Sequence, residues 1–133
     1  MSVLVGKSAP DFTTQAVLAN DTIVGDYNFD NARNGKYAVV FFYPLDFTFV
    51  CPTELHAFQE KLGQFEQRNA QVIGCSVDSK HTHFAWLNTP IEKGGIQGIT
   101  YPLVADLTKS IAMDYDVLKE DEGVAYRGLF LID

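Results

Sequence analysis

Hydrophobic residues form several short continuous runs along this chain, separated by segments in which apolar and polar positions are mixed. The runs at 38–43 ("AVVFFY") and 71–78 ("QVIGCSVD") are rich in β-branched and aromatic residues. Such runs are typical of strands that are buried on both faces. Shorter apolar segments predict further strands at 103–106 and 125–132.

Two strands are also predicted near the beginning of the chain. The segments "DFTTQAVL" and "DTIVGDYNF" contain β-forming residues and are joined by the turn-prone "ANDT". Together they predict an antiparallel β-hairpin that precedes the main run of strands. Residues 31–37 ("NARNGKY") and the glycine-rich residues 93–102 are predicted to be loops.

Helices are predicted between the buried runs. Apolar residues spaced by 3, 4 and 3 positions predict one helical face that extends to about Ala70; they are Leu55, Phe58, Leu62 and Phe65. A short helix closed by Pro90 is expected at 80–90, and another at 108–117. The alternation of strands and helices predicts an α/β fold with right-handed crossovers, formed by a single domain over residues 1–133.

Composition and charge narrow the functional classes. The chain is 47% hydrophobic and carries 10 basic and 17 acidic residues, for a net charge of −7. These values predict a folded domain, and they argue against nucleic-acid or membrane-surface binding, which needs a basic face. The chain shows no signal-peptide pattern and no apolar run near 18 residues. With only two cysteines, a reducing, cytoplasmic location is expected.

Cys51 is the strongest candidate for chemistry. It follows a buried strand and precedes Pro52, a residue favoured at the first position of a helix. Backbone N–H groups and the helix dipole at that position favour a thiolate over a thiol. The residues alone leave two alternatives open, a reactive thiolate and a small buried hydrophobe. Cys75 lies within the predicted strand at 71–78, so core packing is expected for it.

Neither metal nor phosphate binding is indicated by the remaining motifs. His56, His81 and His83 form no zinc-ligand pattern, and the chain has no Cys-x-x-Cys. His83 and Trp86 could equally pack in the core or lie near a pocket. The glycine-rich stretch 93–98 lacks the spacing of a phosphate-binding loop. We therefore expect no metal and no cofactor.

The stretch "FYPLDFTFVCPTE" resembles the active-site motif of the peroxiredoxins, and most closely that of the typical 2-Cys group, which includes bacterial alkyl hydroperoxide reductase C. The signature Pro-x-x-x-Thr/Ser-x-x-Cys is matched by Pro44, Thr48 and Cys51. Further similar segments are "KSAPDF", "GCSVDSKHTHFAW", "KGGIQGITYPLVAD" and "YRGLFLID", so the resemblance extends over essentially the whole chain.

The resemblance implies a thioredoxin-like fold in its peroxiredoxin variant, with an N-terminal β-hairpin extension. It implies that Cys51 is the peroxidatic cysteine, whose thiolate becomes a sulfenic acid. Thr48 would hydrogen-bond the sulfur and the peroxide, and Pro44 would shield them from water. Arg127 would stabilise the thiolate and the peroxide oxygens, and Glu54 would hold Arg127 in place.

The resemblance also implies partners. These are a hydroperoxide substrate, a thiol reductant such as thioredoxin or a flavoprotein disulfide reductase, and a second copy of the chain in a homodimer, with a decamer as the larger assembly.

Typical 2-Cys members carry a resolving cysteine, a further strand and a helix beyond "FLID", and we expect these C-terminal parts to be missing here. Two other functions are compatible with the sequence: a chaperone-like holdase or non-catalytic assembly protein of the same fold, and a thioredoxin-like disulfide reductase, which "CPTE" disfavours.

Overall fold

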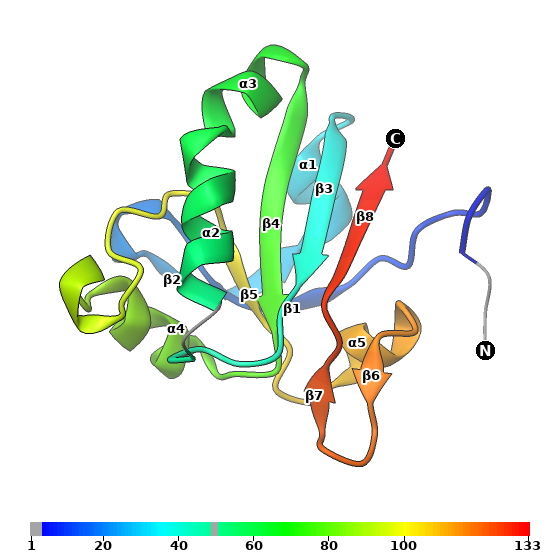
Figure 1. Ribbon diagram of the computed structural model, residues 1–133. Helices are drawn as coiled ribbons and strands as arrows, with labels where there is room; N and C mark the ends of the chain where they lie inside the picture. Colours follow the sequence, from blue (N-terminus) through cyan, green and yellow to red (C-terminus); the bar gives the residue numbers. More distant parts are fainter. Residues whose placement is uncertain (1–3, 49–50) are drawn as a thin grey trace.

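A six-stranded mixed sheet forms the centre of the computed structural model, which describes residues 4–48 and 51–133 without the side chain of Cys51 (Figure 1). The strand order is β2-β1-β5-β4-β3-β8. Strands β3, β4 and β5 are parallel, whereas β8 pairs with β3 and β1 pairs with β5 in antiparallel register. The strands are β1 (Thr13–Val17), β2 (Ile23–Asn28), β3 (Tyr37–Phe42), β4 (Ala70–Ser76), β5 (Leu103–Ala105) and β8 (Gly128–Ile132).

The two continuous apolar runs form adjacent strands in the middle of this sheet. In β3, every residue after Tyr37 is buried, and β4 is buried from Val72 onward. The two strands lie in parallel register, with Val40 opposite Ile73. Both faces of these strands are covered, as the unbroken runs predicted.

The N-terminal hairpin is present as predicted. Strands β1 and β2 pair in antiparallel register around a short 3₁₀ turn, η1 (Ala19–Asp21), with an irregularity between Thr14 and Ala16. Because β1 also pairs with β5, the hairpin extends the central sheet. This arrangement agrees with the expected α/β, thioredoxin-like fold with an N-terminal extension.

Helices cover both faces of the sheet (Figure 1). One buried cluster contains Phe29 of α1 and Ile111 of α5, and the other contains Leu55 of α2 and Trp86 of α4. The helices are α1 (Phe29–Arg33), α2 (Cys51–Glu60), α3 (Leu62–Gln67), α4 (Lys80–Leu87) and α5 (Ser110–Asp114), with a 3₁₀ turn η2 (Ile91–Lys93). Among the described residues, no helix is long and apolar enough to cross a membrane.

Two sequence predictions around the first helices are wrong. Residues 31–37 were expected to be a loop, but α1 occupies their first part because the Asn28 side chain accepts a hydrogen bond from the Asn31 N–H and caps the helix. The helix expected to continue to about Ala70 is divided at Lys61, whose backbone leaves helical geometry (φ −98°, ψ 4°), and restarts as α3.

The C-terminal elements also differ from expectation. The strand predicted at 125–132 is two strands, which have different partners: the Tyr126 N–H still donates to the Val117 carbonyl beside β6, whereas β8 from Gly128 onward pairs with β3. The first, β7 (Val124–Ala125), pairs with β6 (Leu118–Lys119) in a separate two-stranded sheet that was not predicted. The helix expected at 108–117 is shorter, since Asp116 adopts a left-handed conformation (φ 58°).

Gly95 is required by close backbone packing in the loop after α4. A Cβ atom placed on Gly95 would lie 1.9 Å from the Thr89 carbonyl oxygen, so that the backbone would have to move. We expect Gly95→Ala to lower the free energy of unfolding by about 2–4 kcal/mol in urea denaturation. Gly63→Ala is the matched control: Gly63 is exposed in α3 with open space around its Cα, and alanine there should stabilise by about 0.5–1 kcal/mol. Equal effects of both substitutions would contradict the packing argument.

Candidate active site

The backbone of Cys51 begins α2, which follows the carboxyl end of β3 after a turn at residues 43–48. The first turn of α2 contains Pro52 and the acidic Glu54. Unpaired N–H groups and the positive end of the helix dipole lie at such a start, and both favour an anion. The Cys51 side chain lies outside the described part of the structure, so its role as a nucleophile stays a prediction.

Glu54 and Arg127 are brought together although 73 positions separate them in sequence. Arg127 Nε donates to Glu54 Oε1 over 2.6 Å, and the two side chains are 47% and 32% exposed, respectively. Arg127 lies between β7 and β8, so the ion pair joins the C-terminal strands to the first turn of α2. A permanently charged guanidinium is thereby placed beside the start of the helix that Cys51 begins.

A hollow of about 420 Å³ opens next to this ion pair. Apart from Glu54 and Arg127, its lining comes from α2 and from the ends of β3 and β8: Phe41, Phe42, Ala57, Phe58, Gly128 and Leu129. Most of this wall is hydrocarbon. Charge–charge interactions at its rim are therefore stronger than they would be in open water.

Thr48 and Pro44 lie in the turn that precedes α2, and neither lines the hollow beside Arg127. The Thr48 hydroxyl donates to the Leu45 carbonyl over 3.2 Å and faces a second hollow of about 350 Å³, which Pro52 and Gly95 also line. Pro44 is half-buried at the start of the turn and lines neither hollow. The predicted site residues thus surround the start of α2 in two groups, Glu54 with Arg127 and Thr48 with the turn.

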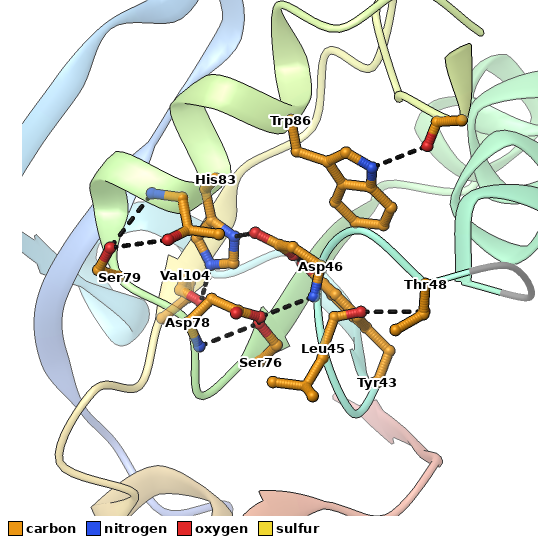
Figure 2. A network of polar contacts seen from close by, with 12 residues as sticks. Tyr43, Leu45, Asp46, Thr48, Ser76, Asp78, Ser79, His83, Trp86 and Val104 are labelled. Carbon is orange, nitrogen blue, oxygen red and sulfur yellow. Dashed lines mark hydrogen bonds and ion pairs between the residues drawn. The ribbon is translucent and has the colours of Figure 1, made fainter. Parts of the chain in front are cut away.

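A buried polar network beneath the turn was missed by the sequence analysis (Figure 2). His83 Nδ1 lies 2.6 Å from Asp46 Oδ2, and both side chains are fully inaccessible to solvent. The Tyr43 hydroxyl donates to Asp46 Oδ1 over 2.8 Å, and His83 Nε2 lies 3.0 Å from the Val104 carbonyl. The available signal was Asp46 itself, the one charged residue in the stretch "FFYPLDFTFV".

Helix α4 positions His83 for this contact. Ser79 caps the helix by accepting from the Thr82 N–H, and residues 83, 86 and 87 then share one buried face, whereas His81 points to solvent. On the same face, Trp86 Nε1 donates to the Gly94 carbonyl over 3.0 Å and anchors the glycine-rich loop. His83 and Trp86 are therefore packed residues of the core.

The environment of the network shifts the proton affinities of its members. Burial alone would lower the pKa of His83, but the hydrogen bond and charge of Asp46 outweigh it, so that the pKa is raised. Burial raises the pKa of Asp46, although the contact with His83 opposes this shift. Burial also raises the pKa of Tyr43 well above its usual value, so the hydroxyl remains a donor. The His83–Asp46 pair therefore retains a shared proton above the pH at which a free histidine loses it.

Cys75 packs in the core, as predicted. It lies in β4 opposite Phe42 on one side and Val104 on the other, with no solvent exposure. Burial, and next the charge of Asp106, raise the pKa of its thiol well above the ordinary value. A thiol held protonated in apolar surroundings is a poor nucleophile. Where the structure describes side chains, no three His, Cys, Asp or Glu residues form a group that could hold a metal ion.

Comparison with known proteins identifies the family. Residues 5–133 match the AhpC/TSA family. The chain is 54% identical over 129 residues to peroxiredoxin-2 of Mus musculus, covering 97% of this chain and 64% of the relative. It is 55% identical over 133 residues to alkyl hydroperoxide reductase C of Helicobacter pylori (strain ATCC 700392 / 26695), covering 98% and 66%.

Solved structures agree with this assignment. The fold superposes on the reduced 2-Cys peroxiredoxin of Plasmodium vivax with a TM-score of 0.93 and 48% identity, over 98% of this chain and 79% of that one. The chain spans about 64% of the length of curated relatives such as the mouse protein. On the family match and these identities, the chain belongs to the AhpC/TSA family and, within it, to the typical 2-Cys peroxiredoxins.

Proposed function

We propose that this protein is a thiol-dependent peroxidase that reduces hydrogen peroxide and small alkyl hydroperoxides at Cys51. The observation that carries the proposal is the Glu54–Arg127 ion pair at the first turn of the helix that Cys51 begins. A helix start and a guanidinium both stabilise a thiolate and the negative charge that develops on a peroxide oxygen. The names of the relatives, peroxiredoxin and alkyl hydroperoxide reductase, support the same chemistry.

The reaction step is a two-electron transfer between sulfur and oxygen. The Cys51 thiolate attacks one peroxide oxygen, the S–O bond forms and the O–O bond breaks. Sulfur is oxidised to a sulfenic acid, and the departing oxygen takes up a proton and leaves as water or an alcohol. A thiol reductant then attacks the sulfenic acid, releases water and forms a disulfide.

The remaining predicted residues have supporting roles in this proposal. Arg127 stabilises the attacking thiolate and the departing oxygen, and Glu54 restrains the guanidinium. Thr48, three positions before Cys51, donates its hydroxyl to the Leu45 carbonyl in this structure, and in the proposed reaction the hydroxyl rotates to donate to the peroxide. Pro44, half-buried at the beginning of the turn, limits the entry of water.

The partners that we propose follow from the same chemistry. The reductant is a dithiol protein such as thioredoxin or a flavoprotein disulfide reductase, and the location is cytoplasmic. The protein self-associates as a homodimer, with a decamer as the larger assembly. The outer strand β8 supports self-association, because its Leu129 and Leu131 side chains are 58% and 72% exposed.

The two cysteines provide an internal test of this function. After rapid mixing with one equivalent of hydrogen peroxide, quenching with an alkylating reagent and peptide mass analysis should show Cys51 oxidised much faster than Cys75. The physical reason is that the Cys75 thiol is fully buried with a raised pKa. Cys51→Ser is the control and should leave the peroxide unconsumed on this time scale. Equally slow oxidation of both cysteines would refute the proposal.

A further inference from the structure

The hollow that Thr48 faces is larger than hydrogen peroxide needs. Its volume is about 350 Å³, which lies at the lower end of the range for small-molecule sites. Hydrogen peroxide has only a pair of heavy atoms, so the rest of this space can be filled only by the organic part of a larger hydroperoxide. The walls of the hollow therefore influence which alkyl hydroperoxides the protein accepts.

Hydrogen bonds fix the elements around this hollow to one another. Its lining comes from the turn before α2, from the first turns of α2, and from η2 with the glycines that follow it. His56 Nε2 lies 3.4 Å from the Gly95 carbonyl and joins α2 to the loop after η2. Trp86 Nε1 donates to the Gly94 carbonyl over 3.0 Å and joins the same loop to α4 (Figure 2). The backbone framework of the hollow is thus preformed.

Part of the wall is exposed hydrocarbon. The side chains of Phe47 and Ile91 are 53% and 60% exposed, and both line the hollow together with Pro52. The Phe47 ring also packs against Trp86, with 5.9 Å between the ring centroids. An alkyl or aryl group that covers these side chains removes apolar surface from water, which favours binding. The hollow is therefore suited to the organic part of a hydroperoxide.

The hollow carries positive charge although the chain as a whole is acidic. The chain has 17 acidic and 10 basic residues, yet the described residues that line the hollow include Lys93 and no Asp or Glu. Glu92, the neighbour of Lys93 in sequence, does not line it, and Lys93 forms no salt bridge with another described residue. In the hollow beside Arg127, by contrast, Glu54 already balances the cation. An anionic group would therefore be attracted to the hollow that Lys93 lines.

We propose that Lys93 is a specificity-determining residue, which favours alkyl hydroperoxides that carry a carboxylate in this hollow while their peroxide group meets Thr48. The inference rests on the proposed function and adds the class of substrate to it. The reaction step is unchanged: the Cys51 thiolate takes one peroxide oxygen, the O–O bond breaks, and the organic part takes up a proton and leaves as an alcohol that keeps its carboxylate. Because Thr48 and Lys93 belong to different elements, a spacer such as an aryl ring must separate the two groups of the substrate.

Cumene hydroperoxide and its para-carboxylated form test this selectivity. Second-order rate constants for Cys51 oxidation are measured by stopped flow for wild type, Lys93→Gln and Lys36→Gln. Lys36→Gln is the matched control, because it removes the same charge from an exposed lysine before β3, at the opposite end of that strand from the turn. Lys93→Gln should lower the ratio of the carboxylated to the unsubstituted substrate about three- to fivefold, the effect of one partly solvated charge. Lys36→Gln should keep the wild-type ratio.

Two further measurements do not depend on the folding of Lys93→Gln. In the wild type, the same ratio should fall as the salt concentration rises, because exposed charges are screened. Ile91→Ala should slow both cumene substrates relative to hydrogen peroxide, since it removes part of the apolar wall. Leu107→Ala is its control, because Leu107 is also 60% exposed and does not line the hollow.

The outcomes separate this inference from the proposed function. A ratio that Lys93→Gln leaves unchanged, or a wild-type ratio that salt leaves unchanged, would overturn the role of Lys93. Equal behaviour of Ile91→Ala and Leu107→Ala would overturn the placement of the organic part in this hollow. In each of these cases, fast oxidation of Cys51 by hydrogen peroxide would still support the proposed function. Wild-type Cys51 that reacts with hydrogen peroxide no faster than Cys75 would instead refute that function.

Discussion

Replacing Arg127 with alanine is expected to lower the second-order rate constant for Cys51 oxidation by about 10²–10³-fold, the cost of removing a fixed donor from a developing oxyanion. The guanidinium is charged at every working pH, and its contact with Glu54 places that charge next to the first turn of α2. Stopped-flow measurement of peroxide consumption, with the folded state confirmed by circular dichroism, provides the readout. The partial exposure of Arg127 predicts that the variant folds.

Three further variants identify what Arg127 contributes. Arg127→Lys keeps the charge but not the planar fork, so its rate should fall between wild type and alanine. Glu54→Gln should cost less than about tenfold, since a partly exposed ion pair is worth only about 0–1 kcal/mol. Arg68→Ala is the control for a lost arginine, because Arg68 is exposed at the end of α3 and bonds the Gln64 carbonyl. If Arg127→Ala reacted at the wild-type rate, Arg127 would not stabilise the thiolate or the departing oxygen, and this part of the proposed mechanism would be wrong.

The sequence was sufficient to predict the elements that are buried on both faces. The apolar, β-branched runs of β3 and β4 favour strands in the middle of a sheet, and the structure places them there. It was not sufficient for elements whose ends depend on tertiary contacts. The last predicted strand is divided because its first part pairs with β6 and its second part with β3, and no local sequence pattern indicates this change of partner.

In the candidate site, too, the features set by local sequence could be predicted, and those set by tertiary contacts could not. Cys51 before Pro52 was an informative local signal, since a helix start is a local event. Arg127 was indistinguishable from a surface charge until a resemblance placed it, because its partner Glu54 is 73 positions away. The Asp46–His83 contact, 37 positions apart, was not predicted at all. Spacing on one helix indicates which residues share a face, but it does not indicate which carboxylate another element will bring to them.

The buried His83–Asp46 pair should also make the stability of the protein depend on pH. The folded-state pKa of His83 is raised above its ordinary value, so its contribution is complete below about pH 6.5 and is lost as the pH rises through the folded pKa. Near that pH, His83→Gln should lower the free energy of unfolding by about 3–5 kcal/mol, because Asp46 is left as a buried charge without its partner.

Urea denaturation of wild type, His83→Gln and His81→Gln at about pH 6.5 and about pH 9 measures this contribution. The difference between wild type and His83→Gln should be largest at the lower pH. It should narrow at the higher pH, since the deprotonated wild-type pair resembles a glutamine opposite a carboxylate. His81→Gln should keep the wild-type slope, because His81 faces solvent on the same helix. A difference that stays constant between the two pH values would show that His83 stabilises the turn by packing alone, without the shared proton.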